Sequence, residues 1–190
     1  MQNTNLTTAP DPRKLIRGDL IKVNDGKATR RDGTTPPAEL LVTGVIIANR
    51  RWSEQKVIDV AVDGPNEPLA NVDELNAAIP QETWEKGLDG KPRAPWERVV
   101  GFYLTDTKEA GSYTWMNSTY GARLAFERLR ERIGNMTRIR GRAVAPIVRI
   151  GGKPMKTNFG RRTRPEFEVV SWIEVNGGNP PPAIGYVDAS

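Results

Sequence analysis

A single amphipathic helix among many strand-forming runs limits the folds open to this chain more than any other feature. Its apolar residues recur at i, i+3, i+4, i+7 and i+11, the spacing that places side chains on one side of a helix. These residues are Ala122, Ala125, Phe126, Leu129 and Ile133. We predict a helix over residues 118–133, capped by Asn117 or Ser118 and ended by Gly134 and Asn135.

The strand-forming runs lie on both sides of that helix. They cover residues 20–23, 40–48, 56–62, 99–104, 112–115, 138–150 and 166–175, and Gly44 predicts a bulge within the second run. An antiparallel barrel with a helix between its third and fourth strands is the oligonucleotide-binding (OB) arrangement. We therefore expect a mainly β (α+β) fold, an OB-like antiparallel β-barrel with long loops.

The positions of proline and glycine predict the domain organisation. Residues 16–175 are expected to form one OB-like domain, with a flexible N-terminal arm over 1–15 and a flexible tail over 176–190. Residues 64–95 contain five prolines and two short helical turns, so they predict a long surface excursion. Trp84 and Trp96 are expected to fix it to the core.

The chain contains neither cysteine nor histidine, which excludes several classes of chemistry. Disulfides, thiol nucleophiles, imidazole bases and the usual zinc sites are all absent. We expect no cofactor, and the missing cysteines are typical of a cytosolic protein. No apolar run approaches the 18 residues of a membrane span, and no secretory signal is visible at the N-terminus, so no membrane partner is expected.

Positive charge is concentrated in residues 132–164, which hold ten lysines and arginines and no acid. They exceed the chain's net charge of +5, so the rest of the chain is net negative. Arg138, Arg140 and Arg142 are expected on one face of a strand, and 151–164 as a basic loop. Because the planar guanidinium suits phosphate oxygens, this stretch predicts a nucleic-acid partner. A solvated basic surface is the alternative explanation.

Aromatic residues beside these charges would serve as platforms for bases. Trp52 follows Arg50 and Arg51 at an expected turn, and Phe159 lies in the basic loop, whereas Phe102 and Trp172 belong to apolar runs typical of a core. The candidate nucleic-acid-binding residues are Arg138, Arg140, Arg142, Lys153, Lys156, Arg161, Arg162, Arg164, Trp52, Phe159, Arg50 and Arg51.

Two carboxylate pairs are further candidates for catalytic groups. Asp59 and Asp63, or Glu166 and Glu168, would be cofacial in a strand and could hold Mg²⁺ in a nuclease. No catalytic pattern connects the two pairs, so surface carboxylates are the favoured reading and no catalytic or metal site is expected.

Several phrases of the sequence resemble a known group of proteins. They are residues 73–80 (DELNAAIP), Trp84-Glu85 with Gly87 and Gly90, 92–96 (PRAPW), 154–157 (PMKT) with Phe159-Gly160, and 164–170 (RPEFEVV). Over roughly residues 40–175 they resemble uncharacterised phage and prophage proteins of proteobacteria. The resemblance implies a viral protein working in the host bacterial cytoplasm. A weaker resemblance is to phage single-stranded-DNA-binding proteins of the OB type, whose frequent acidic tail is lacking here, since residues 176–190 hold only Asp188.

These observations lead to one expected function and two alternatives. The chain is expected to bind single-stranded nucleic acid, DNA in the first place, in replication or recombination, with a homo-oligomer as a further possibility. The alternatives are a virion structural protein or inhibitor that binds a host protein without catalysis, and a Mg²⁺-dependent nuclease.

Overall fold

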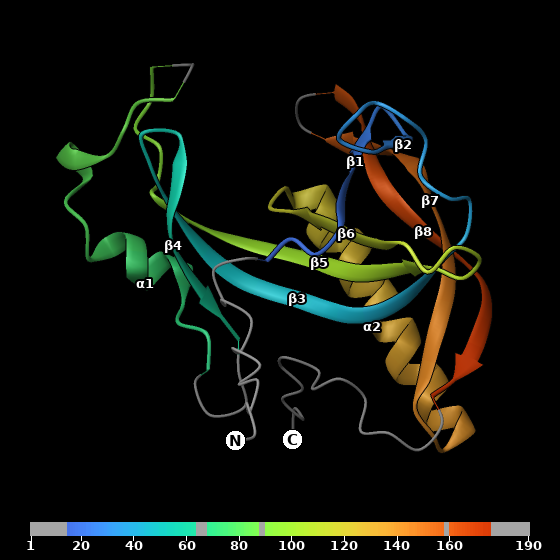
Figure 1. The fold of residues 1–190 in the computed structure, drawn as a ribbon. Coiled ribbons are helices and arrows are strands. Elements are labelled where there is room, and N and C mark those ends of the chain that lie inside the picture. Colours follow the sequence, from blue (N-terminus) through green and yellow to red (C-terminus); the bar gives the residue numbers. More distant parts are fainter. Residues whose placement is uncertain (1–14, 64–67, 88–89, 158–159, 176–190) are drawn as a thin grey trace, which may run out of the picture.

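The protein is mainly β, an open sheet of eight strands with one long helix (Figure 1). The computed structural model describes residues 15–63, 68–87, 90–157 and 160–175. The strands are β1 (Asp19–Asn24), β2 (Lys27–Thr29), β3 (Leu40–Ser53), β4 (Lys56–Val62), β5 (Trp96–Asp106), β6 (Ser112–Asn117), β7 (Val144–Thr157) and β8 (Gly160–Glu174). The helices are α1 (Val72–Ala77), the 3-10 turn η1 (Gln81–Thr83) and α2 (Tyr120–Arg140).

The strands follow the order β2-β1-β6-β5-β3-β7-β8, and β4 pairs with β3. Every pairing is antiparallel except that of β1 with β6. The register between β3 and β5 shifts between Val42 and Gly44, which confirms the predicted bulge. The strands near the two ends of this order come into contact. The β1–β2 turn lies against β7, so closely that a Cβ added to Gly152 would lie 2.1 Å from the Cα of Gly26.

The core lies between the sheet and α2, and four aromatic rings form its centre. Phe102 of β5 stacks near Trp115 of β6 with ring centroids 6.0 Å apart, and it lies 4.9 Å from Phe126 of α2. Phe167 of β8 packs edge-on against both Phe102 and Trp115. The predicted helix stripe is confirmed, because Ala122, Ala125, Phe126 and Leu129 are buried and Ile133 packs against the same core.

The helix is longer than the sequence pattern predicts. It begins after Thr119, whose hydroxyl accepts a hydrogen bond from Ala122 N, and it runs through Gly134 to end at Gly141 in the left-handed conformation. The expected end at Gly134-Asn135 is therefore wrong. A glycine inside a helix costs only about 0.5–1 kcal/mol relative to alanine, and the half-buried Ile133 and Met136 hold the helix together on either side.

The basic stretch folds differently from the expectation. Arg138 and Arg140 lie in the last turn of α2, so they do not form one face of a strand with Arg142. The alternation of arginine and isoleucine in 138–142 resembles a strand period, but Ile139 is 78% exposed and has no core to face. The loop expected over 151–164 is also wrong, because these residues are mostly the outer halves of β7 and β8.

The surface excursion is anchored to the sheet by a buried asparagine. Asn76 of α1 donates its side-chain amide to Trp96 O at 3.0 Å and accepts from Trp96 N at 2.9 Å. Trp84 is half-buried, and its indole donates to Ile79 O, so it links two parts of the excursion and not the excursion to the core. Trp96 is the first residue of β5.

The terminal segments fall largely outside the described residues. Of the arm predicted over 1–15 only Leu15 is described, and it is buried against Ile46 and Ala48, while the predicted tail over 176–190 is not described. None of the helices in the described ranges combines the length and the apolar composition needed to cross a membrane.

Candidate nucleic-acid interface

The outer halves of β7 and β8 form a two-stranded hairpin that carries much of the positive charge. Across the two strands, Met155 pairs with Arg162 and Lys156 with Arg161. Because directly opposed residues of an antiparallel pair share a face, Arg162 lies on one face of the hairpin and Lys156 and Arg161 on the other. The hairpin thus presents cations on both of its faces.

Four of the candidate cations lie exposed on this hairpin. They are Lys153, Lys156, Arg161 and Arg162. We call the parts of β7 and β8 that carry them, residues 151–157 and 160–164, the basic hairpin. Within the described residues none of the four forms an ion pair with a carboxylate. These residues are therefore available to an anionic partner.

Four of the other six arginines of the basic stretch, Arg140, Arg142, Arg149 and Arg164, are paired with glutamates from elsewhere in the chain. Arg140 and Arg142 both reach Glu174, the latter at 2.8 Å, and Arg149 Nη2 lies 2.6 Å from Glu39 Oε1. Arg138 is hydrogen-bonded to Asn135 within α2. These contacts leave less free charge here than the sequence suggests.

Arg164 is the clearest departure from the expected site. Its side chain is 4% exposed, and its Nη1 lies 2.7 Å from Glu166 Oε2 and 3.2 Å from Pro165 O. The expectation that it contacts phosphate at the surface does not fit this placement. Arg164 instead packs against the start of α2, because a Cβ added to Gly121 would lie 2.9 Å from Arg164 Cβ.

Trp52, with Arg50 and Arg51, lies at the other end of the sheet, near the end of β3. Trp52 is half-buried, its indole donates to Glu97 Oε1 at 2.7 Å, and the guanidinium groups of Arg50 and Arg93 lie 5.1 and 5.8 Å from its ring centroid. Arg50 Nη2 donates to the same glutamate oxygen at 2.6 Å. Trp52 is therefore held in a strand rather than displayed on a turn.

The pKa of Glu97 reflects this environment. Burial pushes the pKa up, but hydrogen bonds from Trp52, Ser118 and Arg50, together with the positive charge of Arg50, outweigh that effect. The pKa of Glu97 consequently lies below the ordinary glutamate value, so the carboxylate remains charged at neutral pH. Arg50 is committed to this carboxylate, whereas neither Arg51 nor Arg93 has an ion-pair partner among the described residues.

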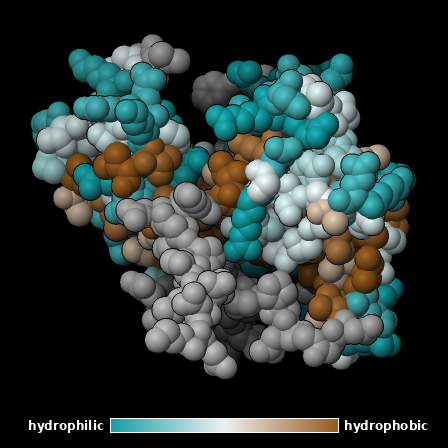
Figure 2. Space-filling view, viewed as in Figure 1, coloured by the Kyte–Doolittle hydropathy of each residue, from teal (hydrophilic) through white to brown (hydrophobic). Residues whose placement is uncertain are grey.

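A cavity of about 530 Å³ opens beside Trp52, between β3 and the surface excursion. Arg51, Trp52, Trp84, Lys86 and Arg93 contribute to its lining. This end of the sheet therefore also combines aromatic rings with cations. In Figure 2 hydrophilic surface covers the upper part of the molecule at both ends of the sheet, where the β3–β4 turn and the β1–β2 and β7–β8 hairpins of Figure 1 lie.

The other aromatic residues divide between core and surface. Phe102, Trp115 and Tyr113 are buried and cannot stack on a ligand, Trp172 is half-buried rather than core, and Phe159 lies outside the described residues. Tyr103 is half-buried beneath the guanidinium of Arg17, 4.2 Å from its ring centroid, and burial raises the pKa of its hydroxyl against the opposing charge of Arg17.

Tyr120 is the exposed aromatic residue that sequence reasoning missed. It is the first residue of α2, its side chain is 68% exposed, and it lines a cavity together with residues of the basic hairpin. Its position directly after the helix cap was the available signal, because a first-turn aromatic outside the apolar stripe must face away from the core.

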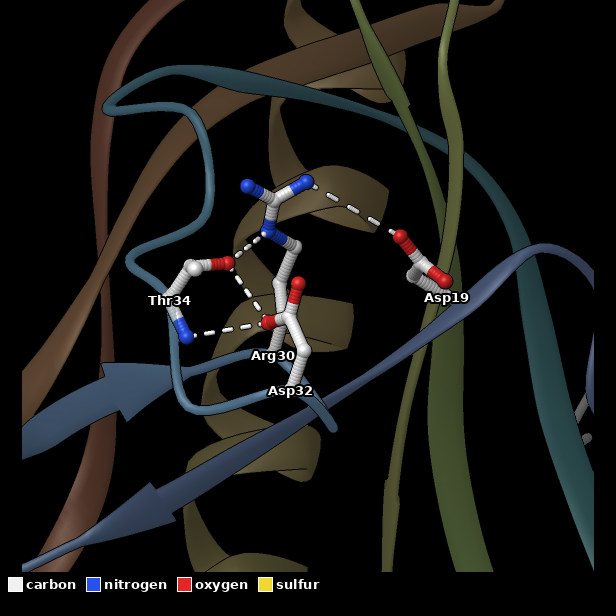
Figure 3. A network of polar contacts seen from close by, with 4 residues as sticks. All are labelled: Asp19, Arg30, Asp32 and Thr34. Atoms are coloured by element: carbon white, nitrogen blue, oxygen red, sulfur yellow. Dashed lines mark hydrogen bonds and ion pairs between the residues drawn. The ribbon is translucent and has the colours of Figure 1, made fainter.

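Arg30, by contrast, is occupied within its own loop (Figure 3). Its Nε donates to Thr34 Oγ1 at 2.7 Å, and its Nη1 lies 3.9 Å from Asp19 Oδ2. Asp32 accepts from both the hydroxyl and the backbone N–H of Thr34, and these hydrogen bonds lower the pKa of Asp32. This network shapes the loop after β2 and offers no free cation.

Three of the four carboxylates considered for Mg²⁺ have local partners. Asp59 accepts from Val60 N, Asp63 from Leu69 N, and Glu166 is paired with Arg164. In the part of the chain that the structure describes, no three acidic side chains gather where they could hold a metal ion.

Comparison with known proteins gives no further assignment, because no family model, no curated protein and no solved structure matches this chain. The resemblance to phage and prophage proteins accordingly stays a prediction.

Proposed function

We propose that this chain binds single-stranded DNA through the basic hairpin, with little sequence preference, as an OB-like protein of phage type acting in replication or recombination in the host cytoplasm. The observation that carries the proposal is the contrast within one basic stretch. Arg140, Arg142, Arg149 and Arg164 are paired with glutamates, the first two sharing Glu174, whereas the four cations of the basic hairpin are exposed and have no acidic partner among the described residues. Unbalanced exposed cations on a hairpin are suited to phosphates.

The order of the elements supports the OB-like part of the proposal. β3, β5 and β6 form an antiparallel meander, α2 follows as the connection, and β7 returns to pair with β3 before β8. This order is consistent with an OB-like arrangement, in which a helix follows three strands and precedes two more. The parallel strand β1 beside β6 is a departure, and it occupies the position where an OB barrel would close.

The placement of the charge supports a single strand over a duplex. The hairpin presents cations on both faces, and the exposed ring of Tyr120 lies beside it. Trp52 provides a second aromatic ring at the other end of the sheet. Bases of a single strand can stack on such rings, whereas those of a duplex are already stacked.

The test is the affinity for a labelled 30-nucleotide single strand and for the matching duplex, measured by fluorescence anisotropy at several salt concentrations. We expect tight, salt-sensitive binding that prefers the single strand. The variant Arg161→Gln/Arg162→Gln should weaken binding several-fold at low salt. The matched control Arg142→Gln/Arg149→Gln removes the same charge from arginines paired with glutamates and should have a much smaller effect.

Three outcomes would contradict the proposal. Equal losses from both variants would mean that overall charge, not the hairpin, governs binding. A preference for the duplex would overturn the single-strand part. Absence of binding at low salt would mean that the hairpin meets an acidic protein, as in a virion component or an inhibitor of a host protein.

A further inference from the structure

We propose that the cavity between the start of α2 and the basic hairpin is a subsite for one unstacked nucleobase, with Tyr120 as the stacking residue and Lys156 and Arg162 as contacts to the flanking phosphates. This inference rests on the proposed function and assigns a specific place on the surface to one nucleotide of the bound strand.

The cavity is formed where the start of α2 meets the hairpin. Its volume is about 660 Å³, within the range of roughly 300–1,000 Å³ that is usual for small-ligand sites. One wall is made by Thr119, Tyr120 and Gly121, and the other by residues of β7 and β8. Apart from the cap residue Thr119, both walls consist of regular secondary structure, which favours a preformed site.

Gly121 permits this close approach of helix and hairpin. A Cβ at that position would lie 3.3 Å from the terminal methyl carbon of Met155 and 2.9 Å from Arg164 Cβ. Met155 is half-buried, so its apolar side chain lines the cavity beside the tyrosine. An apolar floor next to an aromatic ring suits the flat face of a base.

Tyr120 has no structural task that would explain its exposed ring. The side chain is 68% exposed, and within the described ranges its hydroxyl donates no hydrogen bond. Trp52, the platform expected from the sequence, is less free, because Glu97 holds its indole N–H and two guanidinium groups lie over its ring. Tyr120 therefore offers a more accessible π-face beside the hairpin.

The charges that line the cavity are distributed as a nucleotide requires. Arg162 and Lys156 are exposed and free of acidic partners among the described residues, while Arg164 at the base is neutralised by Glu166. Positive charge thus lies at the rim and is cancelled deeper in, which leaves the interior suited to an uncharged base and the rim to phosphates.

The experiment compares two probes that differ only in their bases. One is a labelled 15-nucleotide poly-deoxythymidine strand, and the other is an abasic strand of the same length that keeps every phosphate. The full chain is tested as wild type and as Tyr120→Ala, Tyr120→Leu and Tyr120→Phe. Because the side chain is largely exposed, all three variants should keep the wild-type melting temperature.

On the thymidine strand, Tyr120→Ala and Tyr120→Leu should weaken binding by roughly 5- to 150-fold, the loss expected for one stacked base. Tyr120→Phe should retain the wild-type affinity, because the ring is kept. On the abasic strand none of the three should change the affinity, while Arg162→Ala should weaken the binding of both probes.

The outcomes separate this inference from the proposed function. If the wild type binds neither probe at low salt, the proposed function fails. If the wild type binds the thymidine strand but Tyr120→Ala binds it equally well, the subsite is overturned and the proposed function is retained. Equal losses on the thymidine and abasic strands would overturn stacking in favour of a contact with the backbone.

Discussion

Trp52 and Glu97 are joined by a 2.7 Å hydrogen bond from the indole Nε1 to Oε1, and the same oxygen accepts from Arg50 Nη2 at 2.6 Å. Glu97 of β5 thus holds together two side chains of the neighbouring strand β3. Replacing it by glutamine removes the charge while nearly preserving the shape. We expect Glu97→Gln to lower the free energy of unfolding at pH 7 by about 1–3 kcal/mol, measured by urea denaturation.

The same variant has a defined pH dependence. The pKa of Glu97 is lower in the folded chain than the ordinary value of about 4.3, so its contribution to stability is complete above that value. It is lost as the pH falls toward the lower pKa of the folded protein. The stability difference between wild type and Glu97→Gln should therefore shrink between neutral pH and pH 3. A difference that is constant over this range would contradict the assignment of charge to Glu97.

Asn76→Ala should detach α1 from the sheet. The side chain makes hydrogen bonds to both the backbone N–H and C=O of Trp96, so its removal leaves both groups without their partner. We expect a loss of about 2–3 kcal/mol in the free energy of unfolding. Limited proteolysis should show faster cleavage in the excursion between β4 and β5. Thr83→Ala is the matched control in that segment, because its hydroxyl bond to Pro80 O is exposed, and unchanged proteolysis of Asn76→Ala would contradict the anchor.

Gly141→Ala tests where α2 ends. Gly141 has φ +62° and nothing within 4 Å of an added Cβ, so the cost of alanine there is conformational. We expect a destabilisation of about 1 kcal/mol in urea denaturation. Gly151→Ala is the control, since a Cβ there also meets open space and its φ is not positive, and it should be close to neutral. Equal effects of the two substitutions would argue against a left-handed cap at Gly141.

The sequence carries the local parts of this fold but not its long-range pairings. The stripe from Ala122 to Ile133 indicates α2 because a buried face needs a helical period, and the bulge at Gly44 follows from a glycine in a strand. The end of α2 was misplaced because packing around Gly134 overrides the local preference of a glycine. The sequence of the outer parts of β7 and β8 is typical of a loop. These parts form strands because they pair with each other, and no local pattern in the sequence indicates that pairing.

The candidate site was predictable in chemistry and less so in geometry. The concentration of arginine and lysine in one segment identifies the basic hairpin, but Glu39 lies 110 residues from Arg149, so the sequence does not show which charges are neutralised. From the sequence Arg164 is indistinguishable from the surface arginines beside it, but the fold buries its side chain. The sequence does not identify Tyr120 as a site residue, because only the fold brings Met155 and Arg162 beside it.

The salt dependence of single-strand binding tests the central claim most directly. For single strands the slope of log K against log salt is about −0.7 for each phosphate neutralised. Removing all four cations with Lys153→Gln, Lys156→Gln, Arg161→Gln and Arg162→Gln should therefore make the slope shallower by up to about 2.8 relative to the wild type. A variant that stays folded and shows the wild-type slope would contradict the role of the basic hairpin in binding DNA.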